Sequence, residues 1–164
     1  MSVTQEIKKR SEEILLSIKS IEQFRKEDTM VDMVFKIGKE IYKTPLDRAS
    51  PAVLISHGSH LAGAYAYIGQ KSARARAERD VFEQSIEEQE KALMLKFLDS
   101  QYKVTEARAE VSAELAEARS QLIMYETVKN QWEAIEKGCS TMLSFVQSAI
   151  KMKENERFIN KNNQ

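Results

Sequence analysis

Apolar residues recur at helical spacing along most of the chain. In residues 3–27, Ile7, Ile14 and Ile21 follow one another at intervals of seven among Lys, Arg, Glu and Ser residues. This pattern predicts an amphipathic helix whose narrow apolar stripe must pack against another helix, because so polar a helix cannot form a core alone.

The segment MVDMVFKIGKEIY at 30–42 fits two kinds of element. Its Val, Phe, Ile and Tyr residues raise strand propensity. Val34, Ile37 and Ile41 also suit one face of a helix, and Gly38 could interrupt either element. Of the two, we favour the helix.

A long helix is predicted from Pro51 to about Ser100. Pro45 indicates a connector, and Ser50-Pro51 is typical of an N-cap followed by proline at the first helical position. The first half of this helix is rich in small residues, which let another helix approach closely (Gly58, Ala62, Gly63, Ala64, Ala66 and Gly69).

The last third of the chain has the strongest helical periodicity. Thr105 is predicted to cap a helix, with Glu106 in its first turn, where an acid suits the helix dipole. Apolar residues then step by three, four and seven, and Trp132 is expected to be a packing residue among them (Val111, Leu115, Leu122, Tyr125, Val128, Trp132, Ile135 and Met142). We expect a bend or break at Gly138 before a final helix from Ser140 to about Glu156.

The composition favours an all-α fold. Two prolines and five glycines in 164 residues are too few for the turns of an all-β protein. We expect three-quarters or more of the residues to be helical, in long amphipathic helices that form an elongated helical hairpin or bundle. The expected parts are an N-terminal helical segment at 1–44, a helical core at 45–158 and a frayed tail at 159–164.

One 18.8 kDa chain has few ways to cover the apolar stripes on 3–27 and 104–156. This predicts a homo-oligomer that buries the stripes between subunits. Cys139 is the only cysteine, so no internal disulfide can form and a reducing compartment fits. With no signal peptide and no stretch of roughly 18 apolar residues, we expect a soluble, cytoplasmic protein without a membrane partner.

The chain shows no catalytic constellation. It lacks phosphate-binding glycine loops, paired cysteines and the nucleophile elbow of hydrolases. His57 and His60 share a helix face, but Asp47 and Glu78 are too distant in sequence to complete a local metal site. Cys139 is interpreted as a small core residue. We therefore expect no enzyme activity, no metal and no cofactor.

The 25 basic and 25 acidic residues balance overall but not locally. Residues 71–79 contain four basic residues against Glu78 alone, a net charge of +3, whereas residues 80–117 contain ten acidic and four basic residues, a net charge of −6. The total excludes a globally basic nucleic-acid binder, and it leaves room for a local basic patch.

That patch is the candidate binding site. On a helix, Tyr67, Lys71 and Arg74 fall on one arc, and Tyr65, Arg76 and Arg79 fall on another. Aromatic rings beside cations suit single-stranded nucleic acid, because bases stack on the rings while the cations contact phosphates. In the alternative interpretation, the tyrosines pack in a subunit interface and the arginines pair with downstream acids such as Glu83 and Glu87.

Two segments resemble the UvsY-type recombination mediator proteins of bacteriophages. IGQKSARARAERDVFEQS (68–85) resembles the basic segment of that family. YETVKNQWEAIEKGCSTMLSFVQSAIKMKENERF (125–158) is similar in having an aromatic residue, a cysteine-containing turn and an apolar helix that ends in a basic cluster. KVTEARAEV (103–111) resembles a helix start common in such phage proteins. The resemblance covers roughly residues 50–158.

The resemblance implies an all-helical subunit in a closed ring of six to eight copies. It also implies binding to single-stranded DNA, through Lys71, Arg74 and Arg76, with Arg79 as an addition. The implied partners are a RecA-like recombinase and the single-strand-binding protein that it displaces. The alternative is a helical phage protein that scaffolds or bridges other proteins without binding nucleic acid.

Overall fold

The protein is all-α. The computed structural model describes the backbone of residues 3–26, 28–44, 46 and 48–162, and the side chains of residues 9, 12–26, 28–44, 46 and 48–158. Within this part of the chain there are five helices and no strand, and the helical content is 90%. This confirms the expected all-α class and the expected helical content, whereas the elongated hairpin or bundle and the oligomer remain predictions.

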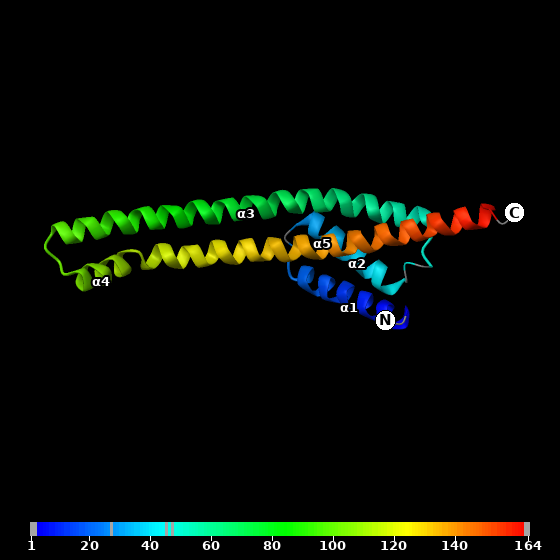
Figure 1. Ribbon diagram of the computed structural model, residues 1–164, viewed down its shortest axis with the longest axis horizontal. Coiled ribbons are helices and arrows are strands. Elements are labelled where there is room, and N and C mark those ends of the chain that lie inside the picture. Colours follow the sequence, from blue (N-terminus) through cyan, green and yellow to red (C-terminus); the bar gives the residue numbers. More distant parts are fainter. Residues whose placement is uncertain (1–2, 27, 45, 47, 163–164) are drawn as a thin grey trace. The chain divides into compact units, whose positions relative to one another are not determined.

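The five helices follow the apolar periodicity of the sequence (Figure 1): α1 is Val3–Glu22, α2 is Thr29–Lys43, α3 is Pro51–Asp99, α4 is Val104–Glu114 and α5 is Ala116–Asn162. The ambiguous segment at 30–42 is therefore helical, and Gly38 does not interrupt it. The predicted cap at Ser50 is present, because its Oγ accepts a hydrogen bond from the Val53 amide at 3.3 Å. The connector expected at Pro45 lies outside the described residues.

Several predicted helix boundaries are wrong. α1 ends at Glu22, before the expected end at 27, and α5 continues to Asn162, beyond the expected end at about Glu156. The N-cap of α4 is Lys103 and not Thr105, although Glu106 does lie in the first turn and accepts a hydrogen bond from the Lys103 amide at 3.1 Å. Gly138 lies inside α5, and the chain is interrupted at Leu115 instead. A Cβ at Gly138 would lie 3.1 Å from Ile21 Cδ1, so this glycine permits close packing of α1 and does not end a helix.

The chain forms two compact units. The first comprises Met1–Gln70 and Trp132–Gln164, and the second comprises Lys71–Gln131, so α3 and α5 contribute to both. The segments expected from the sequence, 1–44, 45–158 and 159–164, remain predictions. α5 ends at Asn162, and the side chains of the expected frayed tail lie outside the described residues.

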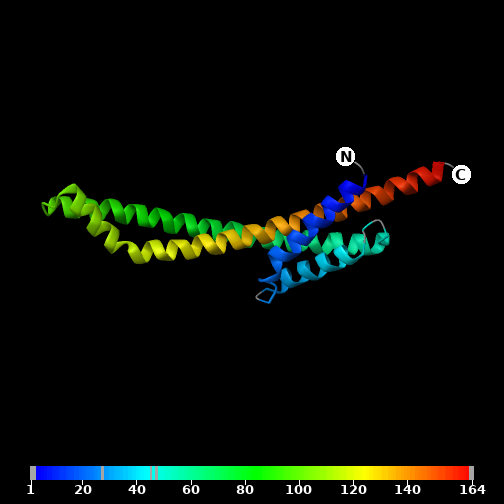
Figure 2. The same ribbon diagram turned by 90° about the horizontal axis from the view of Figure 1, so that it is seen from below.

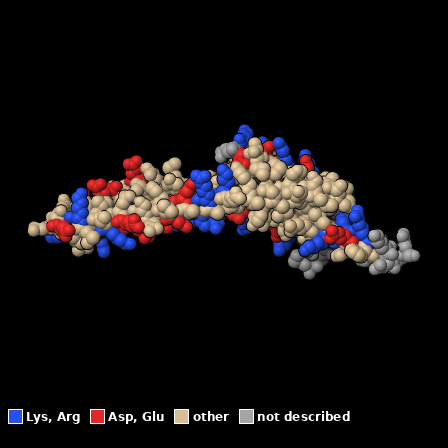
Figure 3. Space-filling model, turned by 90° about the horizontal axis from the view of Figure 1, so that it is seen from above, with Lys and Arg blue, Asp and Glu red and all other residues tan. Residues whose placement is uncertain are grey.

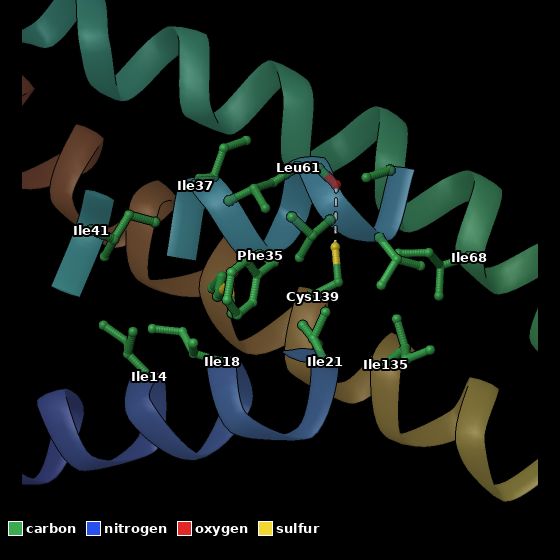
Figure 4. Close-up of a cluster of buried hydrophobic side chains, with 14 of the residues drawn as sticks. Ile14, Ile18, Ile21, Phe35, Ile37, Ile41, Leu61, Ile68, Ile135 and Cys139 are labelled. Carbon is green, nitrogen blue, oxygen red and sulfur yellow. Dashed lines mark hydrogen bonds between the residues drawn. The ribbon is translucent and has the colours of Figure 1, made fainter. Parts of the chain in front are cut away.

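The first unit contains the larger core. Helices α1 and α2 pack against each other and supply most of its aliphatic residues, and α3 and α5 complete it (Figures 2 and 4). Phe35 belongs to this core and is 1% exposed. Trp132 is half-buried and packs against the core, as the periodicity of the sequence predicts. The core residues are Ile14, Ile18, Ile21, Val31, Val34, Phe35, Ile37, Ile41, Leu61, Ala64, Ile68, Ile135, Cys139, Met142 and Val146.

Cys139 lies in this core, as predicted. Its Sγ is 3.6 Å from the carbonyl oxygen of Leu61 (Figure 4). Burial raises the pKa of the thiol to about 12, because a thiolate is poorly solvated among apolar side chains. The protonated thiol predominates at neutral pH, which makes Cys139 a packing residue and a poor nucleophile.

The second unit has a smaller core. Ile86 of α3 packs with Val111 of α4 and with Leu115, and partly buried residues surround them. Phe82 also stacks on Tyr125 of α5, with ring centroids 4.9 Å apart. These contacts join residues 71–99 of α3 to α4 and to the beginning of α5 within this unit.

Candidate nucleic-acid interface

Helix α3 carries all six residues of the candidate site. The four cations, Lys71, Arg74, Arg76 and Arg79, form the basic segment and belong to the second unit. Tyr65 and Tyr67 belong to the first unit. The long uninterrupted helix explains this regular placement, since no proline occurs in α3 after Pro51.

Arg74 is far more accessible than Arg79. Its side chain is 77% exposed, and its Nε donates a hydrogen bond to Glu78 Oε1 at 2.7 Å. The hydrogen bond and the charge of Glu78 raise the pKa of Arg74. Ion pairs one turn apart on an exposed helix contribute little stability, so a phosphate can compete with Glu78 for this guanidinium.

Arg79 is in a different environment. Its side chain is 25% exposed, and its Nε donates to Glu126 Oε2 of α5 at 2.8 Å. Its other nitrogens bind Asp80, at 3.0 Å, and both carboxylate oxygens of Glu83. Hydrogen bonds to Asp80 and Glu126 raise its pKa, so the cation is held among three carboxylates. This is the pairing with downstream acids that the sequence left open.

Lys71 and Arg76 complete the basic segment. Lys71 is half-buried, whereas Arg76 is exposed. Both also take part in interactions within the chain. Arg74 and Arg76 are therefore the two cations of the segment that the structure leaves exposed to solvent.

The two tyrosines differ in accessibility. The Tyr67 hydroxyl donates a hydrogen bond to Asp28 Oδ2 at 2.8 Å, and its ring packs against the core of the first unit. Asp28 also caps α2, because its Oδ1 accepts from the Met30 amide at 2.8 Å. Tyr65 is 37% exposed. Of the two rings proposed for base stacking, Tyr65 is the more accessible one.

The histidines line a shallow hollow of about 530 Å³ in the first unit, together with Asp32 and Glu40 of α2. His57 Nε2 lies 3.5 Å from Glu40 Oε2, a neighbour that sequence distance concealed. Among the described side chains, no group of three His, Cys, Asp or Glu residues is arranged to hold a metal ion.

Comparison with known proteins gives no further identification: no family model, no curated protein and no solved structure matches the chain. None of the helices in the described residues has an apolar stretch long enough to cross a bilayer.

The environment of the Glu126 carboxylate should make the stability of the fold depend on pH. Hydrogen bonds from Lys129, at 2.9 Å, and from Arg79 lower its pKa below the ordinary value of 4.5. A lowered folded-state pKa adds stability that is complete above the unfolded-state pKa and is lost as the pH falls through the folded-state pKa.

We therefore expect Glu126→Gln to lower the thermal midpoint of the second unit at neutral pH. The difference from the wild type should shrink as the pH is lowered through and below 4.5. Thermal unfolding followed by circular dichroism at several pH values measures this. A difference that stays constant across that range would show that the carboxylate charge does not contribute.

Proposed function

We propose that the protein binds single-stranded DNA through α3 and acts as a recombination mediator. The observation that supports this best is the exposure of Arg74 and Arg76 on a helix whose upstream side lacks acids, since residues 48–77 contain no Asp or Glu. Exposed guanidinium groups suit phosphate contacts, and the Glu78 carboxylate that pairs with Arg74 is itself an exposed partner that a phosphate can replace.

Binding by one subunit would be weak. Arg74 and Arg76 would contact phosphates and release counterions. A homo-oligomer, six to eight subunits by the family resemblance, would present several basic segments to one strand. The second and later contacts would then form at high effective concentration, so the overall affinity of several weak sites would be high. Each single contact would still dissociate readily, so the strand could be released step by step.

In the mediator role, the bound strand would be transferred to a RecA-like recombinase while the single-strand-binding protein is displaced. The resemblance to UvsY-type proteins assigns nucleotide hydrolysis to the recombinase. The mediator therefore needs no catalytic residue, metal or cofactor of its own. The mediator would bind the strand reversibly and would offer a binding surface to the recombinase.

A second candidate is an oligomeric scaffolding protein that does not bind nucleic acid. The observation in its favour is Arg79, which is surrounded by Asp80, Glu83 and Glu126. In this case the basic segment would serve to hold α3 and α5 together in the second unit. DNA binding by the purified protein distinguishes the two candidates.

The mediator role is tested by recombinase loading. Single-stranded DNA is covered with a single-strand-binding protein, a RecA-like recombinase is added, and the lag before its ATPase activity begins is measured. We expect the protein to shorten this lag, and Arg74→Ala combined with Arg76→Ala to remove the effect. A lag unchanged by the wild type, in the presence of measurable DNA binding, would contradict the mediator role and leave DNA binding in place.

A further inference from the structure

The first part of α3 exposes a face that carries no charge. From residue 52 to residue 70, all exposed positions are uncharged, and together they form what we call the uncharged face: Ala52, Val53, Ile55, Ser56, Ser59, His60, Ala62, Gly63, Tyr65, Ala66 and Gln70. In Figure 3 this part of α3 shows a broad area without Lys, Arg, Asp or Glu side chains.

Other helices of the first unit have the usual solvated composition. Exposed positions of α1 include Lys9, Glu12 and Lys19, and those of α2 include Lys36 and Lys43. The uncharged face instead exposes large apolar side chains, with Val53 at 44%, Ile55 at 61% and Tyr65 at 37%. Depletion of charge around aromatic and aliphatic residues is the composition of the buried part of a protein interface.

Gly63 lies within the uncharged face. Among the residues that the structure describes, a Cβ added there would meet no atom within 4 Å. At Gly38 and Gly138, by contrast, an added Cβ would lie about 3 Å from side chains of the core. Glycine weakens a helix, and at an exposed helical position it leaves room for another chain to approach closely.

We propose that the uncharged face binds a second copy of this chain. A face without charge has no like-charge repulsion when the same surface meets itself, so a symmetric contact between two copies carries no electrostatic penalty. It also carries both halves of a packing arrangement, because Ile55 and Tyr65 project from the same helix that offers space at Ala62 and Gly63. The contact deepens the proposed function, since it joins subunits on the helix that carries the basic segment.

The size of the face sets the expected strength of the contact. Eleven residues are about half of the roughly 20–30 residues per side in a standard interface. This contact alone should therefore be reversible in the micromolar range, and a larger assembly would need a further contact elsewhere.

Sedimentation velocity across the micromolar range tests the proposal in the absence of DNA. We expect the wild type to associate, and Ala62→Glu to raise the dissociation constant about tenfold or more, because each copy would bury an unpaired carboxylate. The matched control is Ala134→Glu, an exposed alanine on α5 of the same unit, which should associate like the wild type. Circular dichroism should show equal helicity for all three proteins.

Gly63→Ala should affect thermal stability and association in opposite directions. We expect the thermal midpoint to rise, because alanine favours the helix and the position is open, while the association weakens as the added methyl groups separate the two copies. A wild type that remains monomeric, or an Ala62→Glu variant that associates like the wild type, would overturn the proposal. Binding to neutral lipid vesicles by a monomeric wild type would also overturn it. Because no DNA is present, these outcomes are independent of whether the protein binds single strands.

Discussion

Arg74→Ala combined with Arg76→Ala should weaken binding to single-stranded DNA by at least about tenfold at low salt and flatten its dependence on salt. Each phosphate contact contributes about 0.7 to the slope of log affinity against log salt for single strands, so losing two contacts removes about 1.4 per engaged subunit. Both side chains are exposed, so the fold should be unchanged. Fluorescence anisotropy with a labelled oligonucleotide at several salt concentrations measures both quantities.

The matched control removes two exposed lysines outside the basic segment. Lys43→Ala combined with Lys137→Ala makes the same change in net charge on α2 and α5. We expect it to affect binding much less. If the arginine variant instead breaks the oligomer, these arginines are interface ion pairs and the basic segment is structural.

Of the substitutions proposed here, Phe35→Ala should lower the free energy of unfolding the most. The ring is 1% exposed in the core of the first unit, and Arg25 and Lys39 lie over it, each 4.6 Å from its centroid. Removing a buried phenylalanine side chain costs roughly 3–5 kcal/mol, because transfer free energy is lost and a cavity remains. Urea unfolding followed by circular dichroism should show the decrease.

Tyr42→Ala is the control for this prediction. Tyr42 is on the same helix but is 49% exposed, so its loss should change the free energy of unfolding far less. Equal effects of the two substitutions would contradict the assignment of Phe35 to the centre of the core. Phe35 lies in the first of the two compact units. We therefore expect Phe35→Ala to lower the urea midpoint of the first unit more than that of the second.

Local features of the fold could be predicted from the sequence. Periodicity located the long helix and the helix at 30–42, and Ser50-Pro51 marked a helix start, because these signals depend on residues within one or two turns. Gly138 was misinterpreted, since the close contact with Ile21 that explains it comes from α1, more than a hundred residues away. Glycine alone does not distinguish a helix break from close packing.

The candidate site divides in the same way. The cations and their helical spacing are visible in the sequence, and so is the pairing of Arg79 with Glu83 one turn later. The contacts of Arg79 with Glu126 and of Tyr67 with Asp28 join different helices, so no local pattern indicates them. Which cation is exposed and which is neutralised is therefore a tertiary property.

A titration of the wild-type protein shows whether it binds single-stranded DNA. Labelled single-stranded DNA is titrated with protein at a low and at a high salt concentration, and anisotropy is recorded. We expect binding at low salt that falls steeply at high salt, with a slope larger than the contacts of one subunit supply. The absence of binding at low salt would contradict the proposed DNA-binding function and favour the scaffolding role.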